Sequence, residues 1–175
     1  PAGRLRESKR GASRADVVVF TKCPPNIRDD EMMEIESSIR NYNSGAVFFS
    51  RIAYGHILSV GEGSPYKPDR VILVSGIANP APPAEYLAQN HSLVKSFSYR
   101  DHHVYTKKDL KLICETAKNL NAVVVTTEKD LVKIDVEFFG KASVPLHYLP
   151  IEVEFLKNGK EFDEMVLNAI RSYAK

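Results

Sequence analysis

Three short apolar runs, each followed by a loop and a helical pattern, constrain the fold of this chain more than any other feature of its sequence. The runs are Val71–Ser75, Leu93–Tyr99 and Ala122–Thr126. The spacing of apolar residues between them predicts a short helix over about 83–90 and a longer one over 106–120. Strands that alternate with helices, and of which 71–75 and 122–126 are almost entirely apolar, indicate a parallel sheet covered by helices on both faces.

We therefore expect an α/β fold with a mostly parallel, Rossmann-like sheet and helices on both faces. Extended runs at 144–149 and 151–156 allow antiparallel strands near the C-terminus. A last helix follows the turn at Asn158-Gly159 and carries apolar residues on one side.

The length and composition of the chain fit a single globular domain. It has 175 residues, of which 43% are hydrophobic and 26% charged, which excludes wholesale disorder. No apolar run approaches the ~20 residues that a membrane-spanning helix needs. Cys23 and Cys114 lie far apart and form no disulfide framework, which favours a cytosolic setting.

Positive charge is concentrated at the start of the chain. The net charge is +2, yet the first 14 residues contain five Lys or Arg and a single acid, Glu7. Such a segment is suited to face an anion. We expect residues 1–15 to form a basic segment between domains, and 16–175 a single α/β domain. The chain begins at Pro1 without an initiator Met, which suggests that it is processed or cut from a longer protein.

In a parallel sheet, every loop that joins a strand to the following helix opens at the carboxyl ends of the strands, where ligands bind. The loops at 76–80, 100–105 and 126–130 are therefore expected to be neighbours in space. This edge of the sheet is the expected ligand-binding edge.

Two of these loops carry residues with catalytic or binding chemistry. Asp101 and His102 place a carboxylate beside an imidazole, a pair that suits a general base with its orienting group or an anchor for a substrate hydroxyl. The alternative is that His102 and His103 are solvated surface histidines in a turn.

The segment Thr126-Thr127-Glu128-Lys129-Asp130 combines hydroxyls, a cation and a helix start. Such a segment suits phosphate binding, with Lys129 neutralising the charge. The alternative interpretation is that Thr127 and Asp130 only cap the helix. In the basic first segment, arginines such as Arg6 could hold phosphate oxygens with two N–H groups of the guanidinium.

Several familiar motifs do not occur in the sequence. No G-x-x-x-x-G-K-[ST] or G-x-G-x-x-G segment is present, so the main phosphate cradle of any triphosphate reaction lies elsewhere. C-x-x-C and H-E-x-x-H are also missing, and no metal site is predicted.

Six segments, in this order, together resemble one family, the tetraacyldisaccharide 4'-kinases, which are the lipid A 4'-kinases of Gram-negative bacteria. Of these segments, PAGRLRE and TTEKDLVK are the most distinctive. The segments are PAGRLRE (1–7), RADVVV (14–19), GIANP (76–80), DHHVYT (101–106), TTEKDLVK (126–133) and YLPIEVEF (148–155).

The resemblance implies an enzyme that transfers the γ-phosphate of ATP, with Mg²⁺, to the 4'-hydroxyl of the tetraacyldisaccharide 1-phosphate precursor of lipid A. It implies a cytoplasmic enzyme, peripheral on the inner membrane, whose N-terminal P-loop domain binds most of the ATP and Mg²⁺. This chain resembles the C-terminal portion, so its implied partners are that P-loop domain, the lipid precursor and, through the N-terminal region, the membrane surface. The chain alone is expected to be inactive.

The resemblance also implies roles for individual residues. The family's DH motif falls on Asp101 and His102, which makes them the catalytic candidates. The resemblance implies that His102 pairs with an acidic residue of the N-terminal domain near the attacking hydroxyl and so assists the catalytic base. Arg6 and Glu7 match the family's Arg-Glu pair near the phosphate. The family's TEKDxVK motif, with a site-lining or structural role, falls on Thr127, Glu128, Lys129, Asp130 and Lys133. The GIANP segment departs from the family pattern, because Ala81-Pro82-Pro83 follows it here in place of an aromatic pair.

Two other classes of function fit the residues. One is a non-catalytic nucleotide- or RNA-binding α/β module with a basic N-terminal arm; the kinase interpretation itself expects no nucleic acid partner. The other is a hydrolase that uses Asp101 and Lys129, which ranks last because no nucleophile motif is present.

Overall fold

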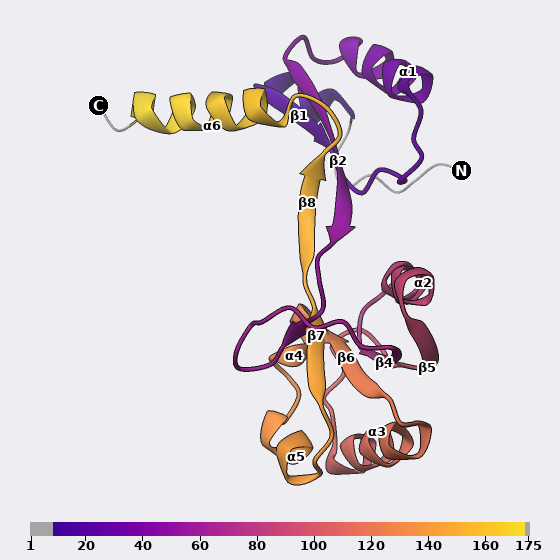
Figure 1. The fold of residues 1–175 in the computed structure, drawn as a ribbon. Coiled ribbons are helices and arrows are strands. Elements are labelled where there is room, and N and C mark those ends of the chain that lie inside the picture. The colour runs from indigo at the N-terminus through magenta and orange to yellow at the C-terminus, as the bar shows by residue number, and fades with distance from the viewer. Residues whose placement is uncertain (1–8, 174–175) are drawn as a thin grey trace. The chain divides into compact units, whose positions relative to one another are not determined.

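The computed structural model describes residues 9–173, and these fold into two compact units (Figure 1). The first unit contains the residues up to Ala53 and those from Val153 onward, and the second is the continuous segment Tyr54–Glu152. The single domain expected over 16–175 is therefore two units. The physical reason is that each unit has an apolar core of its own.

The first unit is built around a three-stranded sheet with the order β1-β2-β8, in which β1 runs parallel to β2. Cys23, Met32 and Phe49 form its small core. Its elements are the 3-10 helix η1 (Lys9–Arg14), β1 (Val17–Phe20), α1 (Asp29–Arg40), β2 (Ala46–Tyr54), β8 (Ile151–Phe155) and α6 (Gly159–Tyr173).

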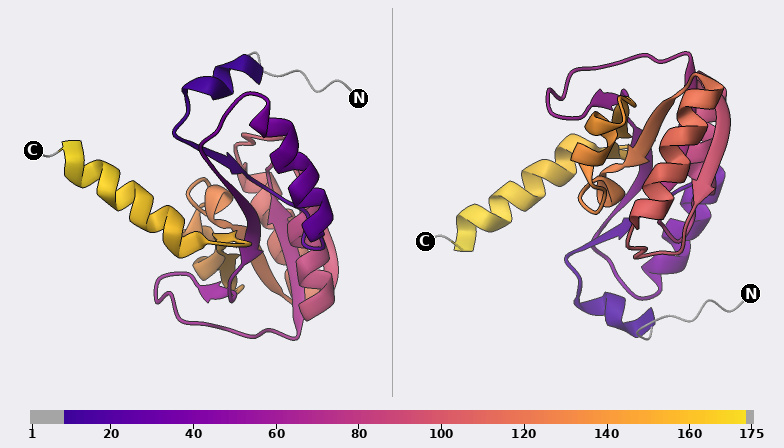
Figure 2. Two further views of the ribbon diagram at one scale, coloured as in Figure 1. Left: turned by 90° about the horizontal axis from the view of Figure 1, so that it is seen from above. Right: turned by 90° about the horizontal axis from the view of Figure 1, so that it is seen from below.

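Helix α6 is anchored to this sheet only near its start. Phe162 packs against Phe48 of β2 and Phe155 of β8, with ring centroids 5.3 and 4.6 Å away. Both views in Figure 2 show the rest of α6 extending away from the sheet of its unit. No residue of α6 is buried, although the helix is amphipathic as the sequence predicts.

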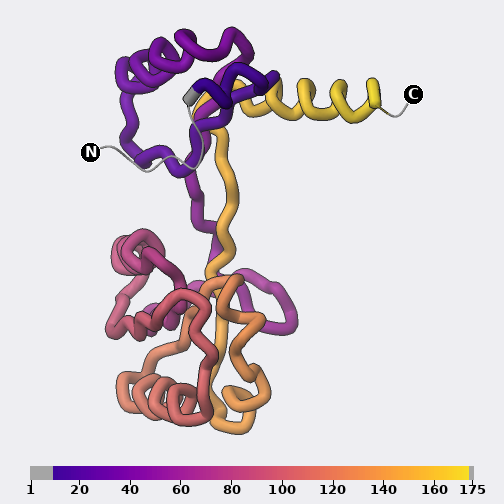
Figure 3. The backbone as a smooth tube through the Cα atoms, turned by 180° about the vertical axis from the view of Figure 1, so that it is seen from behind, coloured from indigo at the N-terminus to yellow at the C-terminus, as the bar shows by residue number. Residues whose placement is uncertain are grey.

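The second unit contains a five-stranded sheet with the order β3-β7-β6-β4-β5, and its chain path can be followed in Figure 3. The pairs β4–β5, β4–β6 and β6–β7 are parallel, and only β3 is antiparallel to its neighbour β7. The expected mixed α/β sheet is thus confirmed. The elements are β3 (Leu58–Ser59), β4 (Arg70–Ser75), α2 (Ala81–Asn90), β5 (Ser92–Ser98), α3 (Lys107–Leu120), β6 (Val123–Thr127), α4 (Glu128–Leu131), α5 (Val136–Lys141) and β7 (Leu146–Leu149).

The central strand β4 shows why its sequence is apolar without interruption. Successive side chains of a strand point to opposite faces of the sheet. Ile72 and Val74 belong to the core that contains residues of α3 and α5, whereas Val71 and Leu73 belong to the core that contains Leu87 of α2. All four β4 side chains are fully buried, because helices cover both faces.

Helix α3 follows its sequence pattern closely. Thr106 caps it in a reciprocal capping box with Asp109, as the spacing predicts. Leu110, Ile113 and Cys114 form the buried stripe. Helix α5, by contrast, was not expected; it is short, starts at the cap residue Asp135 and buries only Phe139. Among residues 9–173, no helix has both the length and the apolar character needed to span a membrane.

Candidate functional site

The candidate site lies at the carboxyl ends of the parallel strands of the second unit. Two hydrogen bonds tie together the segments that follow β4, β5 and β6; after β6 this segment is the helix α4 rather than the expected loop. The backbone N–H of Gly76 donates to Asp130 Oδ2 at 2.7 Å, and Lys129 Nζ donates to Asp101 Oδ1 at 2.6 Å. These bonds join residues 54 and 28 positions apart. The prediction that the three loops are neighbours is therefore confirmed.

Asp101 lies between Lys129 and His102. Its Oδ1 accepts the hydrogen bond from Lys129, and its Oδ2 lies 3.6 Å from His102 Nε2. That second distance is an ion-pair distance and is too long for a hydrogen bond, so Lys129 is the closer partner. The hydrogen bond from Lys129 lowers the pKa of the Asp101 carboxyl, and the charge of His102 adds to this effect. The motifs around Asp101 and Lys129 thus form one group, with an ionised carboxylate at its centre at neutral pH.

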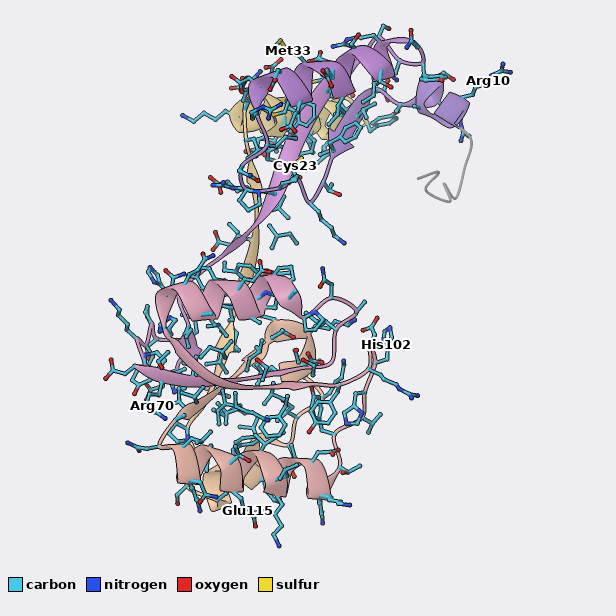
Figure 4. The ribbon with its side chains drawn as sticks, turned by 90° about the vertical axis from the view of Figure 1, so that its right-hand side faces the viewer. Arg10, Cys23, Met33, Arg70, His102 and Glu115 are labelled. Carbon is cyan, nitrogen blue, oxygen red and sulfur yellow. The ribbon has the colours of Figure 1, made fainter. Side chains whose placement is uncertain are left out.

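The imidazole of His102 faces solvent, with 79% of the side chain exposed. Figure 4 shows it on the outer side of its loop. The backbone has a φ of 62°, in the left-handed region where His is among the enriched residue types, and its N–H donates to Asp101 Oδ1. An exposed imidazole next to a carboxylate can meet the hydroxyl of a ligand and accept its proton.

The adjacent His103 has a different environment. Its ring stacks on Tyr99 with centroids 4.3 Å apart and meets the edge of Tyr105. Its Nε2 lies 3.2 Å from Asp109 Oδ2, the carboxylate oxygen that also caps α3. The alternative of two solvated histidines therefore does not describe His103, which joins the loop to the start of α3.

The buried side chain of Asp130 connects the segments of the site through hydrogen bonds. Its side chain is fully buried and accepts hydrogen bonds from Gly76 N, Thr127 Oγ1 and Lys133 Nζ. Burial raises the pKa of Asp130, but the bonds from Gly76, Lys133 and Thr127 outweigh it and lower the pKa overall. The sequence predicts direct phosphate or substrate binding by Thr127 and Asp130. The structure instead uses their polar atoms internally, and Thr127 caps α4 as in the alternative interpretation.

Gly76 lies at a close approach of segments that are distant in sequence. A Cβ at this position would lie 3.1 Å from Asp130 Oδ1 and 3.3 Å from both the Arg100 carbonyl oxygen and Tyr105 Oη. This close packing could not be predicted, because a single glycine after a strand is usually explained by a turn. Its closest neighbours come from loops that are distant in sequence.

We expect Gly76→Ala to lower the free energy of unfolding of the chain by about 1–3 kcal/mol, since the added methyl group must push packed groups apart. Urea denaturation measures this change. The matched control is Gly140→Ala in α5, where an added Cβ has no neighbour within 4 Å and helix propensity favours alanine. Equal stability of the two variants would contradict a tight packing role for Gly76.

Glu128, to which the resemblance assigns a site-lining or structural role, makes a contact within the chain. Its Oε2 accepts the backbone N–H of Ile151 at 3.1 Å. The carboxylate therefore ties the start of α4 to the first residue of β8. This bond keeps a fourth segment of the chain beside the three loops.

Two predicted site residues, Arg6 and Glu7, lie outside the described residues, and their roles stay predictions. Within the described part of the chain, no group of three or more His, Cys, Asp or Glu residues could hold a metal ion. The side chains near the edge that are open to a ligand include His102, Lys129 and Asp101.

Comparison with known proteins decides the family. The model of the tetraacyldisaccharide-1-P 4'-kinase family matches residues 1–171. The chain belongs to this kinase family. The match includes all three loops of the candidate site.

Curated tetraacyldisaccharide 4'-kinases are similar along nearly the whole chain. The protein of Flavobacterium johnsoniae is 34% identical over 98% of this chain and 49% of its own length. Those of Flavobacterium psychrophilum and Bacteroides thetaiotaomicron are 35% and 32% identical, again over 98% of this chain and 50% of their own lengths. The chain therefore spans about half the length of the curated relatives it matches.

A solved structure of the kinase family shares the fold. The crystal structure of "apo" form LpxK from Aquifex aeolicus in complex with ATP matches 96% of this chain and 47% of its own chain. The TM-score is 0.60 at 19% sequence identity. At this identity the likeness concerns the fold alone.

Proposed function

We propose that this chain is part of an ATP-dependent kinase that phosphorylates the 4'-hydroxyl of tetraacyldisaccharide 1-phosphate, and that its second unit presents the catalytic base. The observation that carries the proposal is the exposed imidazole of His102 beside the ion pair of Asp101 and Lys129. Family membership supports the reaction. The names of the curated relatives supply the acceptor, a disaccharide with four acyl chains.

In this mechanism, His102 accepts the proton of the attacking hydroxyl. The negative charge of Asp101, 3.6 Å from His102 Nε2, stabilises the imidazolium that forms. Lys129 holds Asp101 in place with one N–H. An ammonium has three N–H donors, so Lys129 can also offer positive charge to a phosphoryl oxygen.

ATP would supply the transferred phosphoryl group, and Mg²⁺ would neutralise its charge. Lys129 fits a role next to the phosphate, because its side chain is 46% exposed. No described residue is assigned to Mg²⁺, since the described part of the chain has no suitable cluster of ligands. Arg6 and Glu7 are proposed to contribute to phosphate binding from the basic first segment.

The exposed apolar face of α6 is suited to pack against another part of the same protein. Ile170 and Tyr173 are 60% and 92% exposed, and they line a shallow hollow with Val166 and Ala169. An apolar face of this size on a helix is commonly covered by another element. We propose that the P-loop half of the kinase covers it, in an enzyme located at the cytoplasmic face of the inner membrane.

The test compares the 175-residue chain with the full-length kinase, using detergent-dispersed tetraacyldisaccharide 1-phosphate and ATP labelled in the γ-phosphate. We expect label transfer by the full-length protein and none by the chain alone. Transfer by the chain alone would show that it needs no other half. Absence of transfer by the folded full-length protein would refute the proposed reaction, and salt-dependent RNA binding that requires residues 1–14 would favour the alternative module.

A further inference from the structure

Two exposed valines lie on the loops that carry the candidate site. Val104 is 78% exposed and comes two residues after His102, and Val132 is 84% exposed and comes three residues after Lys129. The ion pair between Asp101 and Lys129 joins the two loops. Val104 is thus close in sequence to His102, and Val132 is close in sequence to Lys129. The aliphatic side chains of both valines face water.

Three cations lie within four residues of the first of these valines in the sequence. Arg100, Lys107 and Lys108 are all exposed, and none of the three side chains has an ion-pair partner among residues 9–173. Lys107 and Lys108 also lie in the first turn of α3, where the helix dipole is positive.

The acidic groups of the same segment are already neutralised. Asp101 is paired with Lys129, and Asp109 accepts hydrogen bonds from Thr106 and lies next to His103. The remaining charge beside His102 is therefore positive. We name these five exposed residues the Val104 surface: Arg100, Val104, Lys107, Lys108 and Val132.

We infer that the Val104 surface rests on an anionic phospholipid bilayer and holds His102 at the level of the lipid headgroups. The choice of a bilayer rests on the proposed function. An acceptor with four acyl chains lies in the membrane, so its sugar hydroxyl is at the membrane surface, and His102 must reach it there. Unpaired cations attract anionic headgroups, and short aliphatic side chains can enter the interface next to them.

The chemistry of the surface favours a bilayer over a nucleic acid. Val104 and Val132 offer no aromatic ring on which a base could stack, which is the usual contact with single strands. The cations lie in the first turn of α3 and in the loop before it. Binding is expected to be weak and reversible, because few cations and two short side chains take part.

The first experiment is flotation of the 175-residue chain with vesicles of phosphatidylcholine, with or without phosphatidylglycerol. We expect the double variant Lys107→Glu/Lys108→Glu to bind the anionic vesicles at least about tenfold more weakly than the unchanged chain. The matched control is Lys67→Glu/Lys118→Glu, which makes the same charge change at exposed lysines outside the surface. The apolar face of α6 and the basic first segment could also bind vesicles, but they are the same in both variants. The Val104 surface is therefore tested by the difference in vesicle binding between the two variants. Equal binding by the two double variants would overturn the inference.

The second experiment separates this inference from the proposed function. In the full-length kinase, the Lys107→Glu/Lys108→Glu variant is expected to keep its kcat with detergent-dispersed acceptor and to lose at least about tenfold in rate with acceptor embedded in anionic vesicles. An equal loss in detergent would assign the lysines to the reaction itself and overturn the membrane role. If the full-length protein transfers no phosphate at all, the proposed function fails, and flotation still decides the membrane inference.

Discussion

Replacing His102 with alanine in the full-length kinase is expected to lower kcat by at least about 10²-fold, because the attacking hydroxyl then loses its general base. The stability of the protein is expected to change little, since 79% of the side chain is exposed. Steady-state kinetics with detergent-dispersed acceptor measure the first effect, and thermal unfolding measures the second. Near-normal turnover would remove His102 from the proton transfer.

His103→Gln is the matched control for this experiment. His103 stacks on Tyr99 and lies beside Asp109, so its loss should reduce the free energy of unfolding by about 1–2 kcal/mol. A large fall in kcat with His103→Gln and none with His102→Ala would exchange the roles of the two histidines.

The largest effect on stability is expected at Asp130. Asp130→Ala should lower the free energy of unfolding by about 3–5 kcal/mol, because it leaves Lys133 without its carboxylate and the Gly76 N–H without an acceptor. Urea denaturation of the 175-residue chain measures this change. Asp101→Ala is a suitable comparison, because it also removes a carboxylate paired with a lysine, but at an exposed position. If Asp130→Ala and Asp101→Ala both lowered the free energy of unfolding by a similar, small amount, Asp130 would not hold the segments of the site together.

The stability contributed by Asp130 should depend on pH. Its pKa is lowered in the folded chain, so the folded state favours the ionised form more than the unfolded state does. This stabilisation is complete above the unfolded pKa of about 4 and is lost as the pH falls through the lower folded value. The difference in free energy of unfolding between the unchanged chain and Asp130→Asn should therefore shrink below about pH 4. A difference that stays constant with acidification would show that the charge of Asp130 makes no contribution.

Much of the second unit could be predicted from residue patterns. β4 and β6 are apolar because both of their faces are buried, and α3 shows its cap and its buried stripe in the sequence. From the parallel arrangement alone, it followed that Asp101 and Lys129 would be near each other.

Other features depend on contacts that no local pattern reveals. A charged residue such as Asp130 is normally exposed, and its burial depends on a glycine N–H that comes from another strand end. The division into two units was hidden for a similar reason. The apolar pattern of β8 shows that it is extended but does not show that it joins β2 and not β7.

The hydrogen bond between Gly55 N and Pro150 O has a consequence for the order in which the chain folds. During synthesis, the segment Tyr54–Glu152 leaves the ribosome before β8 does, and it can form its own core first. Once folded, it holds the residues just after β2 and just before β8 next to each other. The long loop between these two strands is then already closed, so β8 can join β2 at a much smaller entropic cost. The same closeness of its ends makes Tyr54–Glu152 a segment that could be excised and produced by itself.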